Sequence, residues 1–188
     1  MEYIRITDQN RYLTNAFIEK HWFSTTMVIR GKTVDMTKVD GIAAINLDEI
    51  AGLLTYIIRD GTCEITSLNS LYKGRGIATE LIEKLKRLAK AAGCNRIIVV
   101  TTNDNVDAIR FYQKRGFDMI RLYHNALDIS RKIKPEIPSV GQDGIPIKHE
   151  IEFELVLSKL TCFTNKLNLL LLHLFQVFVD KISNRAEN

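Results

Sequence analysis

The chain has 188 residues, of which 46% are hydrophobic and 26% are charged, and its formal net charge is +4. This length suits one domain with a substantial core, and the composition excludes a disordered chain. The small positive charge is compatible with an anionic ligand, but the basic residues form no run of the kind that nucleic-acid-binding proteins carry.

The cysteine and histidine positions predict a reduced protein without a metal. The cysteines, Cys63, Cys94 and Cys162, are odd in number and form no C-x-x-C motif, which indicates free thiols and a cytoplasmic location. The four histidines are scattered, with no H-E-x-x-H motif or Cys/His cluster, so we expect no metal site. The first residues lack the basic and apolar regions of a secretory signal.

The N-terminal third is expected to contain short strands and one helix. Four segments have the pattern of strands: 3–6, 41–46, 50–59 and 63–68. Residues 10–22 are predicted to form a helix that turns Leu13, Phe17 and Ile18 inward. The pattern over residues 27–40 predicts no single element.

The clearest helix lies between residues 77 and 92. Its apolar residues recur every three or four positions: Ile77, Ala78, Leu81, Ile82, Leu85, Leu88, Ala89 and Ala92. Gly93 follows as a helix-ending residue. Residues 96–102 form an apolar run that indicates a strand buried on both faces. A second helix is predicted over 106–115, after the capping sequence Asn-Asp-Asn.

The C-terminal part begins with a predicted strand at 117–123. All three prolines lie within 134–147, which predicts a long, structured loop of the kind that often serves function. Apolar residues then alternate with Glu150, Glu152 and Glu154, which predicts a strand with one buried face. The three glutamates are expected on a solvated face, and attraction of a cationic acceptor is the alternative.

The tail, residues 159–188, differs from the rest of the chain. Its apolar segment, 167–179, is too short to span a bilayer, and the polar residues around it fall at helical spacing. We therefore predict an amphipathic helix of unknown role. Packing on the domain or on a homodimer partner is the favoured interpretation, and binding to a membrane surface or a poorly ordered appendage are the alternatives.

A glycine loop separates the strand at 63–68 from the long helix. Gly74 and Gly76 allow a close approach of the backbone to a ligand, and the helix N-terminus exposes unpaired N–H groups. Lys73 and Arg75 add positive charge, and Thr79 adds a hydroxyl donor. This pattern predicts a phosphate or pyrophosphate site. A simple tight turn is the alternative, while a P-loop lysine and the third glycine of a dinucleotide fold are missing.

A second block lies one strand downstream, where residues 105–117 read Asn-Val-Asp-Ala-Ile-Arg-Phe-Tyr-Gln-Lys-Arg-Gly-Phe. This block resembles the motif Asn-x-x-Ala-x-x-(Phe/Leu)-Tyr-x-x-x-Gly-Phe of the GNAT superfamily of N-acetyltransferases. Residues 73–78 resemble that family's other motif, Gln/Arg-x-x-Gly-x-Gly/Ala, with lysine in its first place. The resemblance covers about residues 2–157, most closely 63–123.

The resemblance implies an α/β fold and a cofactor. The fold would be a mixed, mostly antiparallel sheet of six to seven strands, with helices on both faces and a splayed parallel strand pair. The N-acetyltransferase domain would comprise residues 1–158, and acetyl-CoA would lie between the splayed strands at 63–68 and 96–102. The implied cofactor-binding residues are Leu68, Ser70, Asn105 and Phe111 along the pantetheine arm, and Lys73, Gly74, Arg75, Gly76, Ile77, Ala78 and Thr79 at the pyrophosphate.

The family also implies direct attack of an amine on the thioester in a ternary complex. Tyr112 is the expected proton donor to the leaving thiolate, with a buried aromatic as the alternative interpretation. Asn105 could be only a helix cap. Glu64 is the best candidate for the base because period-two counting places it on one face with Thr66 and Leu68, and a solvated strand-edge carboxylate is its alternative.

Other functions remain open at this point. A non-catalytic acyl-CoA-binding or sensor module on the same fold would need the glycine loop but not Tyr112. A nucleic-acid binder would use the basic residues of 73–96, which are better explained as the solvated face of one helix. The acceptor is a small amine, an amino acid, a peptide N-terminus or a protein lysine. The loop over 124–147 is expected to shape that choice, and Trp22 is either core or acceptor-site wall.

Overall fold

The computed structural model describes residues 1–22, 24–47 and 49–157. Met1–Leu157 form one compact unit. The tail predicted at 159–188, with its amphipathic helix and Cys162, lies outside the described residues, and the domain boundary at 158 stays a prediction.

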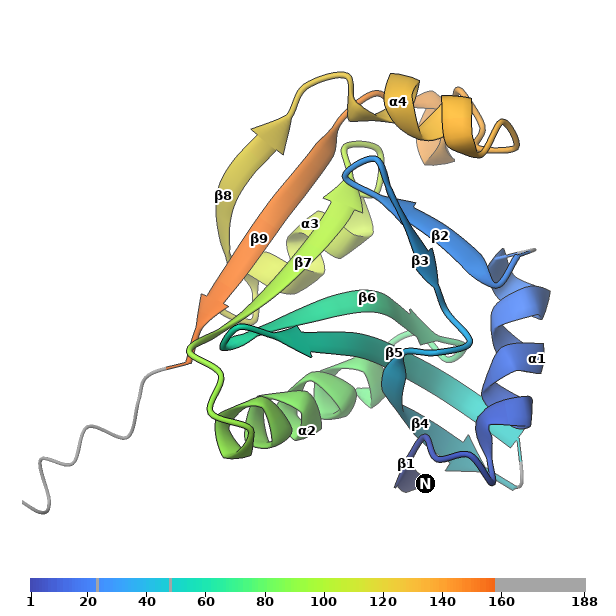
Figure 1. Ribbon diagram of the computed structural model, residues 1–188, viewed down its shortest axis with the longest axis vertical. Helices are drawn as coiled ribbons and strands as arrows, with labels where there is room; N and C mark the ends of the chain where they lie inside the picture. The colour runs from blue at the N-terminus through green and yellow to red at the C-terminus, as the bar shows by residue number, and fades with distance from the viewer. Residues whose placement is uncertain (23, 48, 158–188) are drawn as a thin grey trace, which may run out of the picture. The chain divides into compact units, whose positions relative to one another are not determined.

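One seven-stranded sheet organises this unit, in the order β1-β4-β5-β6-β7-β9-β8 (Figure 1). Its strands are β1 (Glu2–Arg5), β4 (Asp40–Asn46), β5 (Glu49–Arg59), β6 (Thr62–Ser70), β7 (Arg96–Thr102), β8 (Asp118–Tyr123) and β9 (Glu150–Val156). Neighbouring strands run antiparallel except β6 and β7, which are parallel. This confirms the expected mixed, mostly antiparallel sheet.

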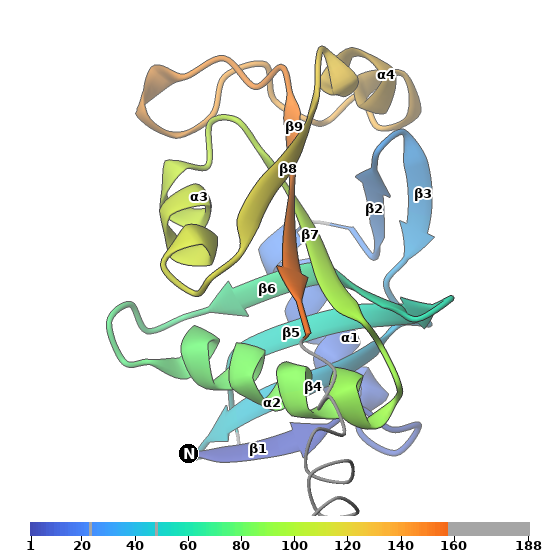
Figure 2. The same ribbon diagram turned by 90° about the vertical axis from the view of Figure 1, so that its left-hand side faces the viewer.

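Helices cover both faces of the sheet (Figure 2). The helices are α1 (Arg11–Trp22), α2 (Ile77–Ala91), α3 (Val106–Gln113) and α4 (Ala126–Ile133), with a short 3₁₀ turn at Gln142–Gly144. The face that carries α2 and α3 is called here the α2 face, and the opposite face, which carries α1, the α1 face. A separate hairpin, β2 (Thr26–Ile29) and β3 (Lys32–Asp35), lies within the stretch for which the sequence predicts no single element.

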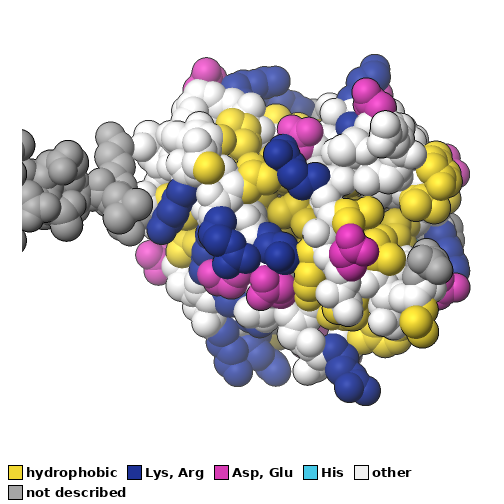
Figure 3. Space-filling model, turned by 90° about the horizontal axis from the view of Figure 1, so that it is seen from below, with side chains coloured by type: hydrophobic (Ala, Val, Ile, Leu, Met, Phe, Trp, Pro, Cys, Tyr) yellow, Lys and Arg dark blue, Asp and Glu magenta, His cyan; other side chains and the backbone are white. Residues whose placement is uncertain are grey.

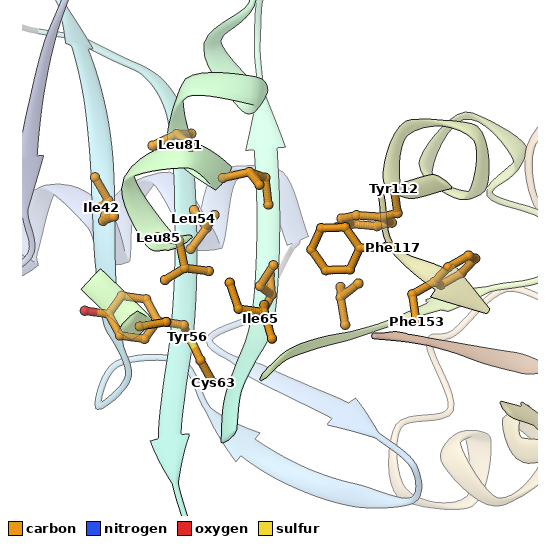
Figure 4. Packing of buried hydrophobic residues seen from close by; sticks show 14 of the residues in the cluster. Ile42, Leu54, Tyr56, Cys63, Ile65, Leu81, Leu85, Tyr112, Phe117 and Phe153 are labelled. Carbon is orange, nitrogen blue, oxygen red and sulfur yellow. The ribbon is translucent and has the colours of Figure 1, made fainter. Parts of the chain in front are cut away.

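Each face has its own hydrophobic core. On the α2 face, Leu81 and Leu85 of α2 pack with Leu54 and Ile65 of the sheet (Figure 4). On the α1 face, the core residues include Ile6, Phe17, Ile18, Met36, Val39, Ala43 and Leu53. The prediction that Phe17 and Ile18 of α1 face inward is confirmed.

The prediction for Leu13 is wrong, because its side chain is 39% exposed. The buried residues of α1 are instead Thr14, Phe17 and Ile18. Positions i, i+3 and i+4 lie on the same face of a helix. Thr14 can occupy a core position because its hydroxyl donates to the Arg11 carbonyl at 2.8 Å.

A β-bulge in β6 opens the sheet. Thr55 of β5 lies opposite Ser67 and Tyr56 opposite Ile65, so Thr66 is an extra residue in β6. β6 pairs with β7 only from Thr62 to Ile65, and beyond that point the two strands separate (Figures 1 and 2). The splayed parallel pair therefore begins at the bulge.

The bulge also reverses which side chains of β6 face each core. Glu64 lies opposite Ile57, which packs on the α1 face, whereas Leu68 lies opposite Leu54, which belongs to the α2-face core. Period-two counting placed Glu64 and Leu68 on one face, and that prediction is wrong because the extra residue shifts the alternation by one.

The hairpin and α4 cover the far end of the α1 face. The hairpin turns at Arg30 and Gly31, whose φ angles are 49° and 68°. Glu150 and Glu152 of β9 are 3% and 8% exposed, so the expected solvated face is wrong for both. Glu154 stays partly exposed and pairs with Arg96 at 3.0 Å.

Candidate active site

The glycine loop follows the open end of β6. Gly74 and Gly76 have φ angles of 76° and 75°, and a Cβ added at either would meet no atom within 4 Å. Gly76 is the N-cap of α2, and the Glu80 N–H is bonded to the Gly76 carbonyl at 3.0 Å. The N–H groups of the first helical turn, at residues 77–79, lack intrahelical acceptors and form the positive end of the helix dipole. The geometry is that of an anion site.

The side chains around the loop differ in their availability. Lys73 is exposed and pairs with Asp107 of α3 at 3.3 Å, so it bridges the two helix N-termini. Arg75 is also exposed. Ile77 is 2% exposed and packs in the α2-face core, so only its backbone is available to a ligand.

Arg115 joins the loop to α3, a role that neither sequence motif indicated. Its guanidinium donates to the Thr79 hydroxyl and, at 2.9 Å, to the Phe111 carbonyl. The same group lies 3.5 Å from the centre of the Phe111 ring, a cation–π arrangement. Burial lowers the pKa of Arg115, against the opposing charge of Glu83. Arg115 thus fixes two of the predicted cofactor-binding residues.

At the start of α3, Asn105 acts as the helix cap. Its Oδ1 accepts the Ala108 N–H at 3.1 Å, and the residue is exposed at the end of β7. The capping interpretation is therefore confirmed, and a contact of Asn105 with the pantetheine arm stays a prediction.

Tyr112 lies in an aromatic cluster beside Ile65, on the α3 side (Figure 4). Its side chain is 6% exposed, and its ring centre is 5.4 Å from that of Phe117 and 6.0 Å from that of Phe153. Burial raises the pKa of Tyr112, with no contribution from a charge or a hydrogen bond. The phenol is therefore held in its protonated form, as a proton donor must be.

On the α1 face, Arg30 at the hairpin turn binds three carboxylates. Its guanidinium contacts Glu64 at 2.5 Å and Glu152 at 3.2 Å, and its backbone N–H donates to Glu150 Oε2 at 2.9 Å. Burial lowers the pKa of Arg30, but the charges of Glu64 and Glu152 have the larger combined effect, so the pKa of Arg30 is raised. Tyr123 donates its hydroxyl to Glu152. We call these five residues the Arg30 cluster.

The Arg30 cluster places Glu64 in an ion pair. Arg30 bonds its Oε1, and the side chain is 24% exposed. The strand pattern indicated Glu64 alone, and nothing in the sequence indicated Arg30 because the hairpin that carries it has no clear sequence pattern. Three carboxylates against one guanidinium leave the cluster with a formal charge of −2.

The described part of the chain shows neither a metal-ligand cluster nor a membrane-spanning helix. Within residues 1–22, 24–47 and 49–157, no three His, Cys, Asp or Glu side chains are grouped so that they could hold a metal ion. The described helices include none with the length and apolar character to cross a bilayer.

The helix surface that suggested a nucleic-acid binder is electrically mixed. On α2, Lys84 and Arg87 contact Glu80, and Lys86 contacts Glu83 at 2.7 Å. Figure 3, which views the molecule from the side of α2, shows basic and acidic side chains intermixed. These lysines and arginines form a solvated, self-compensated helix face.

A family model described as the acetyltransferase (GNAT) family matches residues 11–117, which include both sequence motifs. The chain belongs to the GNAT family. The uncharacterized protein YdhI of Bacillus subtilis (strain 168) is 43% identical over 148 residues, which cover 78% of this chain and 92% of YdhI.

Solved GNAT-type structures share the fold at low identity. A GNAT family acetyltransferase from Elizabethkingia anophelis with acetyl-CoA bound is 17% identical with a TM-score of 0.59, covering 82% of this chain and 97% of that one. The ribosomal-protein-S18-alanine N-acetyltransferase from Escherichia coli is 12% identical with a TM-score of 0.59, covering 84% and 94%. The GNAT fold implied by the two motifs is confirmed.

Proposed function

We propose that the protein transfers the acetyl group of acetyl-CoA to an amine by direct attack in a ternary complex. The observation that carries this proposal is the opening of the sheet at the Thr66 bulge, which leads to the glycine loop at the N-terminus of α2. Membership of the GNAT family and the Elizabethkingia neighbour with acetyl-CoA bound support the choice of cofactor.

The cofactor would follow the open edge of β6. Backbone groups of Leu68 and Ser70 no longer pair with β7, so they are available to the amides of the pantetheine arm. The N–H groups of Ile77, Ala78 and Thr79 would bind the pyrophosphate, and the charges of Lys73 and Arg75 would add attraction. Asn105 and Phe111 would contact the arm from α3.

The reaction would use groups from both faces of the sheet. The amine nitrogen attacks the thioester carbonyl carbon, an N–C bond forms and the C–S bond breaks. Tyr112 gives its proton to the departing thiolate. The nitrogen loses a proton to Glu64, whose Oε2 takes no hydrogen bond from the described residues while Arg30 holds Oε1. The products are the acetylated amine and CoA.

The buried thiols agree with a location in the reducing cytoplasm, which belongs to this proposal. Both described cysteines, Cys63 and Cys94, are free and buried. Burial raises the pKa of Cys63 to about 12, so this thiol is a packed apolar group and not a nucleophile.

The test combines binding and turnover. Calorimetric titration with acetyl-CoA measures binding, and a thiol-release assay against a panel of amines and peptides measures transfer. We expect thiol release that depends on the amine, with an equal amount of acetylated amine by mass spectrometry. Tight acetyl-CoA binding without amine-dependent thiol release, for every amine and peptide in the panel, would instead support an acyl-CoA-binding or sensor module.

A further inference from the structure

A cavity of about 670 Å³ lies between the end of α1, strand β2, and α4 with the loop that follows it. Its wall is largely apolar and includes Trp22, Met27, Val28, Leu127, Ile133, Ile137 and Pro138. Cavities of this volume hold small ligands. The aromatic and aliphatic side chains would favour an apolar ligand body.

One buried carboxylate lines this apolar cavity. Glu150 is 3% exposed, and its Oε2 accepts the Arg30 N–H. Its Oε1 takes no hydrogen bond from any described residue, so one oxygen is left for a ligand. The other ionisable residues of the wall are His21, Lys134 and Glu136, which are partly or fully exposed.

The surroundings of Glu150 favour a cation. The Arg30 cluster has a formal charge of −2, and its member Glu150 is buried, so the ionised carboxylate of Glu150 is costly without a further positive partner. The ammonium group of Lys134, which also lines the cavity, already donates to the Thr26 carbonyl at 3.0 Å. A ligand ammonium group would therefore be stabilised at Glu150.

The register of the sheet places Glu150 beside the cleft. Glu150 lies opposite Thr102, and both residues line the cavity. Thr102 ends the part of β7 that has already separated from β6 after Val99. A ligand on Glu150 would thus lie next to one arm of the open strand pair, away from the glycine loop.

We propose that this cavity binds a small primary amine with an apolar or aromatic body, whose ammonium group contacts Glu150. The identity of this amine as the acetyl acceptor rests on the proposed function, whereas the binding itself does not. A polar polyamine would leave the apolar wall unfilled, and the cavity volume fits a compact ligand better than an extended chain.

The test uses 2-phenylethylamine and its neutral isostere 2-phenylethanol, each titrated into the protein with and without acetyl-CoA. We expect the amine to bind at least about tenfold more tightly than the alcohol, a difference of about 1.4 kcal/mol. Glu150→Gln is expected to remove most of that preference while acetyl-CoA affinity is retained. Glu154→Gln, a glutamate of the same strand outside the cavity, is the matched control and is expected to behave as the parent.

Several outcomes separate this inference from acetyl transfer. Amine binding that depends on Glu150, without thiol release from any amine or peptide of the panel, would support the amine site and remove the transfer reaction. Thiol release with other amines, without binding of 2-phenylethylamine, would support the transfer reaction and remove the proposed amine site. Tighter binding of a tripeptide with an N-terminal phenylalanine would overturn the assignment to a small amine. Should Glu150→Gln fail to fold, equal affinity of the parent for amine and alcohol would by itself overturn the proposal.

Discussion

Two tyrosines, Tyr112 and Tyr56, are buried in the α2-face core, at 6% and 1% exposure. Burial raises the pKa of both phenols, so both keep their protons at neutral pH. Only Tyr112 comes from the second GNAT motif. If it protonates the departing thiolate, Tyr112→Phe is expected to lower kcat by about 10²-fold, the low end for general-acid help. Acetyl-CoA affinity, measured by calorimetry, should stay near that of the parent.

Tyr56→Phe provides the matched control for this substitution. It removes a phenol of similar burial from β5, and kcat is expected to stay unchanged. Melting temperatures of both variants show whether packing has suffered. A normal kcat for Tyr112→Phe, with an amine that the parent acetylates well, would leave Tyr112 as a core aromatic only.

Glu150 is expected to lower stability in the pH range where it would bind an amine. Burial raises its pKa, against the weaker opposing effects of the Arg30 N–H and charge. The folded protein therefore takes up this proton more readily than the unfolded chain, and stability falls as pH rises from the ordinary value of about 4.3 through the raised pKa. Glu150→Gln should then raise the melting temperature at pH 7 by roughly 2–4 °C for each kcal/mol added to the free energy of unfolding. At pH 4 the increase should be smaller.

The measurement is a thermal melt of parent, Glu150→Gln and Glu154→Gln at both pH values. Glutamine can still accept the Arg30 N–H, so the comparison removes the charge and keeps the hydrogen bond. An equal or lower melting temperature of Glu150→Gln at pH 7 would mean that the cluster stabilises the ionised carboxylate.

At the level of elements, α2 has a positive-φ glycine beyond each end. Gly76 and Gly93 share a φ of 75°, and a Cβ at either would meet open space. Gly76→Asp and Gly93→Asp therefore impose similar backbone strain, but only the first places a carboxylate where the pyrophosphate is proposed to bind. We expect Gly76→Asp to weaken acetyl-CoA binding at least about tenfold, or 1.4 kcal/mol, and Gly93→Asp to leave it nearly unchanged. Equal calorimetric affinities in the two folded variants would remove the loop from the proposal.

The elements around the two motifs could be predicted from sequence because their signals are strong. The apolar period marks α2, glycine and asparagine mark helix ends, and the uninterrupted apolar run marks β7 at the observed Arg96–Thr102. The expected bounds of these elements differ from the structure by at most two residues.

The hairpin could not be predicted because its signals are weak. β2 and β3 have four residues each, and the turn has arginine at a positive-φ position where asparagine or aspartate would mark it. That omission explains the error over Glu150 and Glu152, since the alternating strand looks half solvated until the hairpin covers it. The bulge at Thr66 had no sequence mark either, and it reversed the faces assigned to β6.

For the whole molecule, the compact unit ends at Leu157, whose N–H donates to the Asn95 carbonyl at 2.8 Å. If residues 159–188 only pack or dimerise, truncation after Ser158 should leave acetyl-CoA affinity within about twofold. Oligomer size and solubility are the quantities expected to change, and light scattering measures them. A truncated protein that folds but no longer binds acetyl-CoA would show that the tail belongs to the site.

Where β6 and β7 separate, each strand has an unpaired edge inside the sheet, in addition to the outer edge strands β1 and β8. Unpaired strand edges are templates on which other chains assemble into aggregates, and proteins limit that hazard by keeping such edges short and charged. Here the open stretch of β6 spans residues 66–70, and the exposed charges of Lys73 and Arg75 follow it directly. The cleft is thus protected from self-association by the same short length and positive charge that suit it to an anionic cofactor.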